Sequence, residues 1–166
     1  MTLFIQYFMT CYCDMMDASV SKIGVDPDWG FHEDYLFKIL LAILAGCLIG
    51  IEREYKGKDA GIKTNILVAV GACAYLILSL QFYGSEDTDI TRVLGQIVTG
   101  IGFLGAGVIL KREDKIEGLT TAATVWCSAA AGCIAALYMV TNLIVFTVAV
   151  VIINMIFGIL SKNIAS

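Results

Sequence analysis

Three consecutive charged residues, Glu52, Arg53 and Glu54, close a long apolar segment of this sequence. Carboxylates can hold hydrated Mg²⁺ or pair with Lys and Arg side chains. The basic residues downstream that could face Glu52 or Glu54 are Lys63, Lys111 and Arg112. Two interpretations are open: an ion-paired site at the mouth of a membrane domain, or interfacial charges that fix the depth of the preceding segment.

Other polar residues stand inside apolar segments or at their ends. Gln96 and Asn154 lie within such segments, Asn65 begins one, and Arg92 precedes Gln96 by one helical turn. An amide without a partner in hydrocarbon is costly, so each needs a hydrogen bond. Two interpretations are open: the partner is a polar group of a neighbouring helix, or the amide lines a polar pathway for an ion. Arg92 would either reach the headgroups or pair with an outer carboxylate.

The stretch "EGLTTAATVW" is typical of a helix start. We expect Gly118 to make the turn and Thr120 or Thr121 to cap the helix. Its N-terminal dipole would then lie beside basic residues, where it is either simply capped or binds an anionic headgroup or phosphate. The candidate polar site at this face comprises Glu52, Arg53, Glu54, Lys63, Thr64, Asn65, Lys111, Arg112, Thr120 and Thr121.

The residue sets of common enzymes do not occur in this sequence. There is one histidine, His32, and no Ser/His/Asp set, phosphate-binding loop or HExxH motif. Four of the six cysteines fall within apolar segments, where they fill space, while Cys11 and Cys13 are too close together for a comfortable disulfide. We therefore expect no enzymatic activity, no resident cofactor beyond a possible Mg²⁺, and no nucleic-acid partner.

The amino-acid composition indicates that these residues belong to a protein embedded in a lipid bilayer. Of the 166 residues, 58% are hydrophobic and only 16% are charged, against about a quarter in soluble domains. Residues 118–161 carry no charge. As one helix they would measure roughly 66 Å, twice the hydrocarbon core, so they must fold back. An all-α polytopic membrane protein follows.

Hydropathy predicts five transmembrane helices in a domain spanning residues 35–162. A segment of residues 1–34, too short in its apolar part to span, precedes them at the outer interface. The predicted helices are Tyr35–Ile51, Asn65–Phe82, Val93–Leu110, Thr121–Met139 and Leu143–Leu160.

Basic residues are unevenly divided between the two sides of the predicted membrane domain. Lys22, Lys38 and Arg92 fall on the side of the N-terminus. The other side carries Arg53, Lys56, Lys58, Lys63, Lys111, Arg112, Lys115 and Lys162. The positive-inside rule therefore predicts an outer N-terminus and a cytoplasmic C-terminus.

The third predicted helix contains "GIGFLGAG", with Gly100, Gly102, Gly105 and Gly107. Small residues allow helices to approach closely in lipid, whereas a broken helix would expose carbonyls to an ion; both interpretations remain open. Close packing predicts that this helix is central and that Trp126 packs against it. Surplus small-residue surface, including Ala42, Gly46 and Gly50 in the first helix, predicts a homodimer with the first or third helix at the axis.

Four blocks, "GCLIGIERE", "AGIKTNILVAVGA", "QIVTGIGFLGAGVIL" and "GLTTAATVWCSAAAG", resemble the signature blocks of the MgtC/SapB family of bacterial inner-membrane proteins. The resemblance covers residues 36–160 and implies an inner-membrane location and a link to magnesium limitation and survival in host cells. It also implies inhibition of the rotary ATP synthase as described for some members, and putative magnesium transport as assigned to others. Many members continue into a C-terminal cytoplasmic domain, whereas this sequence stops at Ser166, as expected either of a short member or of a chain from which that domain has been removed. Lys63 replaces the usual arginine of the family.

Two functional hypotheses follow from these observations. The first is a non-enzymatic protein of magnesium homeostasis and stress survival, resembling a virulence factor, that binds another membrane complex such as the ATP synthase. The second is a transporter or channel for Mg²⁺ or a related ion. The uncharged interiors of the predicted helices favour the first hypothesis, because Mg²⁺ prefers carboxylate ligands.

Overall fold

The structure is a computed structural model that describes residues 33–81, 90–112 and 115–164. Its contacts divide the chain into Met1–His32 and Glu33–Ser166, and all described elements belong to the second unit. The predictions for the N-terminal segment, Cys11, Cys13 and His32 lie outside the described residues.

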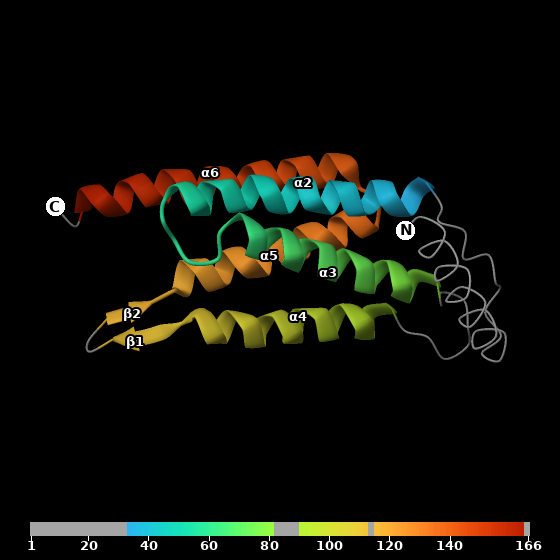
Figure 1. Ribbon diagram of the computed structural model, residues 1–166, viewed down its shortest axis with the longest axis horizontal. Coiled ribbons are helices and arrows are strands. Elements are labelled where there is room, and N and C mark those ends of the chain that lie inside the picture. The colour runs from blue at the N-terminus through green and yellow to red at the C-terminus, as the bar shows by residue number, and fades with distance from the viewer. Residues whose placement is uncertain (1–32, 82–89, 113–114, 165–166) are drawn as a thin grey trace, which may run out of the picture. The chain divides into compact units, whose positions relative to one another are not determined.

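Five helices and one short hairpin make up the described part of the chain (Figure 1). Four helices are long and apolar enough to cross a membrane, and the fifth, α6, has 25 residues with an apolar stretch at Val140–Ile156. The predicted five-helix fold is confirmed; the orientation in the membrane stays a prediction. The elements are α2 (Glu33–Tyr55), α3 (Ile62–Gln81), α4 (Ile90–Val108), β1 (Leu110–Arg112), β2 (Lys115–Glu117), α5 (Leu119–Ala136) and α6 (Val140–Ile164).

All five helices begin earlier than hydropathy predicts, by two or three residues, and α2 and α6 also end later. Hydropathy shows only where a segment becomes apolar. A helix can extend beyond the apolar segment where its polar side chains have hydrogen-bond or ion-pair partners. Glu52, Arg53 and Glu54 consequently lie in the last turn of α2, and Lys63 and Thr64 lie in the first turn of α3.

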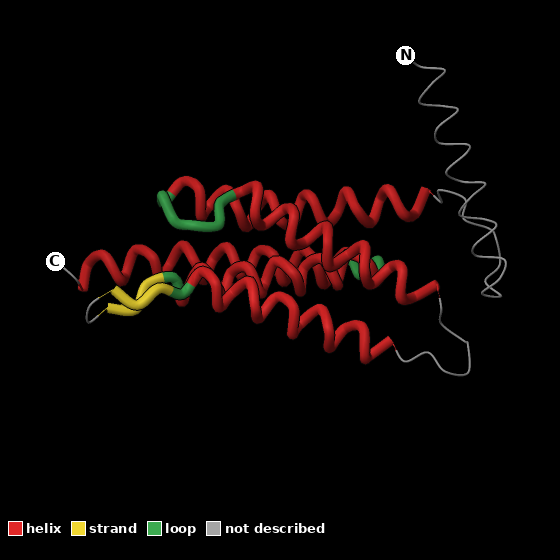
Figure 2. Tube along the Cα trace, turned by 60° about the horizontal axis from the view of Figure 1, so that its bottom comes forward, coloured by secondary structure: helices red, strands yellow, loops and turns green. Residues whose placement is uncertain are grey.

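The centre of the bundle is α5, which packs against all four other helices. Half of its span is buried, compared with 6% for α4. The prediction that the third transmembrane helix is central is therefore wrong: α4 lies at the edge of the bundle, against α5 and α3 (Figures 1 and 2). Trp126, predicted to pack against the glycines of this helix, is half exposed, and a Cβ added to Gly105 would meet Ala122 and not Trp126.

Small residues let α2, α3 and α5 come into backbone contact, as expected in lipid. A Cβ added to Gly46 would lie 2.7 Å from the Asn65 carbonyl oxygen, and one added to Gly50 would lie 2.5 Å from the Ile62 Cα. A Cβ on Gly132 would collide with the Ala69 carbonyl oxygen. The small-residue face of α2 is thus covered by α3 of the same chain, which corrects its assignment to a dimer axis.

A two-stranded hairpin, absent from the prediction, joins α4 to α5. Its strands pair Leu110 with Glu117 and Arg112 with Lys115. Gly118 follows with a φ of +88° and lies so close to the Val108 carbonyl oxygen that a Cβ would not fit. The turn at Gly118 is as predicted, but α5 begins at Leu119 with Gly118 as its N-cap, so the predicted threonine cap is wrong.

The α2–α3 connection, the hairpin, the start of α5 and the end of α6 lie at one end of the bundle (Figure 1). We call this the basic end, because the predicted cytoplasmic Lys and Arg residues that the structure describes are carried there.

Candidate functional site: a buried polar cluster at the basic end

The last turn of α2 carries charged side chains into the protein interior. Glu52 is 8% exposed and Arg53 is 4% exposed. Glu52 Oε1 lies 2.6 Å from Lys56 Nζ, one turn further along the helix. Lys56 Nζ also donates to the Asn154 carbonyl oxygen at 2.8 Å, and its tip occupies the space beside Gly158 where a Cβ would stand. Lys56 therefore neutralises Glu52 and ties α2 to α6.

Arg53 extends from α2 to the start of α5. Its Nη2 donates to Thr121 Oγ1 at 2.6 Å, in a contact where both residues are buried. Arg53 Nε and Glu52 Oε2 have no hydrogen-bond partner within the described part of the chain. A buried charged group with an unused donor or acceptor is costly unless something else satisfies it.

Asn65 links the start of α3 to α5. Its Nδ2 donates to the carbonyl oxygens of Ala60 and Gly61, at 2.6 and 2.9 Å, and its Oδ1 accepts from Ser128 Oγ at 2.7 Å. Asn154 of α6 makes a longer contact of 3.4 Å from its Nδ2 to Thr124 Oγ1. Of the three amides expected to need partners, Asn65 and Asn154 thus have them in α5, whereas Gln96 is exposed on α4.

The cluster contains only some of the predicted site residues. Glu52, Arg53, Asn65, Thr121 and Asn154 belong to it. Glu54 instead accepts a hydrogen bond from the Ile62 N–H at 3.1 Å and so caps α3. The residues of the predicted site with exposed positions are Glu54, Lys63, Thr64, Lys111 and Thr120, while Arg112 ends β1.

Sequence reasoning missed Lys56, Thr124 and Ser128. Lys56 follows Glu52 by four residues, the spacing of a helical ion pair, but the predicted helix ended before it. Thr124 and Ser128 follow Thr121 and Thr124 at helical spacings of three and four, which place them on one face of α5. That periodicity was a usable signal for a polar stripe.

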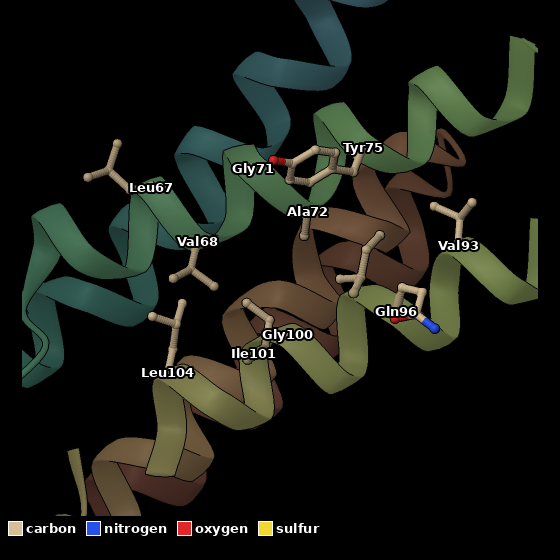
Figure 3. Close-up of a pocket in the computed structure, with 11 residues that line it drawn as sticks. Leu67, Val68, Gly71, Ala72, Tyr75, Val93, Gln96, Gly100, Ile101 and Leu104 are labelled. Atoms are coloured by element: carbon tan, nitrogen blue, oxygen red, sulfur yellow. The ribbon is translucent and has the colours of Figure 1, made fainter. Parts of the chain in front are cut away.

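A separate groove of about 530 Å³ lies between α3 and α4. Figure 3 shows Val68 of α3 and Leu104 of α4 on facing walls. Gln96 and Gly100 line it from α4, and Gln96 is exposed, as is Arg92 one turn before it. A Cβ on Gly100, Gly102 or Gly107 would have no described atom within 4 Å, whereas Gly105 faces Ala122. The glycines of α4 are therefore mostly open surface, not packing contacts.

The charged side chains of the cluster make contacts within the chain. The Glu52 carboxylate is engaged by Lys56, and Arg53 lies next to it in sequence. No group of three His, Cys, Asp or Glu side chains that could hold a metal occurs in residues 33–81, 90–112 and 115–164. The cluster joins α2, α3, α5 and α6 through polar contacts inside an apolar bundle.

These features define a multi-pass helical membrane protein with a polar interior at one end. The model of the MgtC family matches residues 39–163, and the chain belongs to this family. Together with its apolar helices, this makes it a multi-pass protein of the inner membrane.

Two relatives share the name Protein MgtC. The protein of Brucella abortus (strain 2308) is 47% identical over 113 residues, which are 68% of this chain and 47% of that protein. The protein of Salmonella typhimurium (strain LT2) is 42% identical over 120 residues, 72% of this chain and 51% of that protein. The chain thus spans about half the length of these relatives. No solved structure matches it significantly.

Proposed function

We propose that this chain is a non-enzymatic protein of magnesium homeostasis and stress survival that acts by binding another membrane complex. The rotary ATP synthase is the first candidate partner, because family resemblance suggests it. The observation that supports binding is the exposure of α4: its span is 6% buried, and Gly100, Gly102 and Gly107 are open. A glycine surface of this kind suits close contact with a helix of another chain.

The test is site-specific photo-crosslinking in native bacterial membranes. A photoreactive amino acid at Gly102 should give an adduct with a subunit of the ATP synthase, identified by mass spectrometry. The same amino acid at Val145, which is 64% exposed on α6, is the matched control and should give no such adduct. Equal adducts at both positions, or none to the synthase at Gly102, would contradict the proposal.

We also propose that the chain forms a homodimer, now through α4, since α3 covers the small-residue face of α2. A single cysteine at Gly102, in a background without the six native cysteines, should cross-link two copies. A strictly monomeric mass in mild detergent and in membranes, with no cross-link, would rule this out.

The second candidate function is conduction of Mg²⁺ or a related ion. The observation in its favour is the Glu52 carboxylate, which is buried and has an oxygen without a hydrogen-bond partner among the described residues. Its ion pair with Lys56 opposes cation binding, because the ammonium already neutralises it. Saturable Mg²⁺ uptake into proteoliposomes that Glu52→Gln abolishes, while Glu54→Gln does not, would establish this function in place of the first.

A further inference from the structure

One amide side chain of α4 lies at a depth where it needs a hydrogen-bond partner. Gln96 is the sixth residue of the apolar span Thr91–Val108, about 8 Å from the first residue of that span. The side chain is exposed and makes no hydrogen bond within residues 33–81, 90–112 and 115–164. A free amide is costly in hydrocarbon, because lipid tails offer neither donor nor acceptor. Gln96 therefore calls for a polar group from outside the described bundle.

The Gln96 amide lies on the side of α4 that is turned away from the bundle. At about 100° per residue, Gly105 lies about 180° from Gln96, and Gly105 faces Ala122 of α5. Four residues lie within about 60° of one another on the outward side. We call them the Gln96 face, and they are Gln96, Gly100, Phe103 and Gly107.

The Gln96 face has one projecting side chain between two gaps. Phe103 is 82% exposed, while a Cβ on Gly100 or Gly107 would have no described atom within 4 Å. Phe103 follows Gly100 by three residues and precedes Gly107 by four, so a glycine gap lies one turn to either side of the ring. A surface with both a knob and gaps is complementary to a copy of itself, and glycines let two helices approach closely.

The membrane restricts how two copies can meet. All copies have the same orientation in the bilayer, so a two-fold axis runs along the membrane normal and brings equal residues together at equal depth. An amide has both a donor and an acceptor, so two Gln96 side chains can each donate to the other. An acyl chain would fill the glycine gaps, but it would give the amide no partner. The chemistry of this face therefore favours a second copy over lipid.

We propose that two copies of this chain associate through the Gln96 face. The two Gln96 side chains exchange reciprocal hydrogen bonds, and each Phe103 ring packs into the glycine gaps of the other copy. This contact rests on the homodimer proposed above and gives it a surface and a polar pair.

Two neighbouring residues of α4 are compatible with this contact. Arg92 is exposed one turn before Gln96, at the end of the span, where its guanidinium reaches the headgroups and the charges of the two copies are screened. Gly102 lies about 120° from Gln96, so it stays open to a helix of another complex.

The first experiment compares single cysteines at Gly107 and Gly102, a matched pair of open glycines on different sides of α4. Each is placed in the full chain without its native cysteines and oxidised in native membranes, which joins only thiols in direct contact. We expect a disulfide-linked dimer from Gly107→Cys but none from Gly102→Cys, which only a bifunctional reagent of longer reach should link.

The other outcomes separate the contact surface from the homodimer itself. A disulfide at Gly102 that forms as readily as the one at Gly107 would overturn the Gln96 face and leave a homodimer in place. No link at either position, by oxidation or by the longer reagent, would overturn both and would show that lipid covers this face.

The second experiment measures the contribution of the amide. Resonance energy transfer between labelled copies in liposomes gives the dissociation constant of the dimer as the lipid-to-protein ratio is raised. Gln96→Leu should weaken association roughly sevenfold, as for the loss of two hydrogen bonds between membrane helices. Thr99→Val is the control and should change little, because the Thr99 hydroxyl donates to the Gly95 carbonyl oxygen of its own helix. Unchanged association of Gln96→Leu, or an equal loss in Thr99→Val, would overturn the amide pair.

Discussion

Ser128 Oγ donates a hydrogen bond to Asn65 Oδ1 at 2.7 Å, and both residues are fully buried. The amide group of Asn65 also binds the carbonyl oxygens of Ala60 and Gly61, which precede α3. One side chain therefore fixes both where α3 begins and how α3 packs on α5.

Removing the Asn65 amide should destabilise the bundle. Asn65→Ala breaks three hydrogen bonds and leaves the Ser128 hydroxyl with only its contact to the Thr124 carbonyl oxygen. We expect a loss of about 1–3 kcal/mol in the free energy of unfolding, measured by denaturation in mixed detergent micelles. Asn142→Ala, at an exposed position of α6, is the control and should have little effect. Equal stability of the two variants would show that the Asn65 contacts contribute nothing.

The ion pair of Glu52 and Lys56 should behave as a unit. Lys56→Met leaves the Glu52 carboxylate buried without its cation and should destabilise the protein by about 1–3 kcal/mol, less than for a fully buried pair because Lys56 is partly exposed. Glu52→Gln in the same chain should restore part of this loss, because the unpaired charge is removed. A double-mutant cycle of the unfolding free energies measures the coupling; additive effects would show that the pair does not interact.

Glycines that face a neighbouring helix should tolerate substitution less well than glycines on the open surface of α4. Gly132→Ala places a methyl group against the Ala69 carbonyl, so α3 and α5 must separate, at a cost of about 1–3 kcal/mol. Gly105→Leu should also destabilise, because Gly105 faces Ala122. Gly102→Leu should leave thermal stability unchanged and weaken only contacts with other chains. Destabilisation of the isolated protein by Gly102→Leu would show that α4 packs differently.

The predicted orientation in the membrane can be tested at the two ends of the chain, which lie outside the described residues. An impermeant thiol reagent should reach Cys11 and Cys13 from outside intact cells, and a fluorescent protein fused after Ser166 should report the cytoplasm. Labelling of these cysteines only after membrane disruption would reverse the orientation.

The number of helices could be predicted from the sequence, but their arrangement could not. Long uncharged runs, such as residues 118–161, report contact with hydrocarbon, and lipid imposes a helix on each. The same runs do not say which helix is central, because glycine serves equally in a packed interface and on an open surface. Gly132 and Gly102 have the same sequence signal, yet only Gly132 lies against a neighbouring backbone.

The sequence indicated several residues of the polar cluster, but it did not indicate which of them contact one another. Glu52, Arg53 and Asn65 stood out because charges and amides are rare in this chain. Their partners Lys56, Thr121 and Ser128 depend on where α2 ends and on how α5 is rotated, which hydropathy does not determine. The hairpin was missed because three-residue strands leave almost no periodicity to detect.

The peripheral place of α4 has a consequence for biogenesis. In the order of synthesis, α4 follows α3 and precedes α5. Apart from its contact with α2, however, α3 packs mainly against α5. When α4 leaves the translocon, α5 has not yet been synthesised. The face of α3 that packs against α5 in the final bundle must therefore stay accessible, and α4 leaves it free by packing at the edge. The late arrival of α5 then joins α2 and α3 into a finished bundle, and α4, made between α3 and α5, remains the least buried of the four long apolar helices.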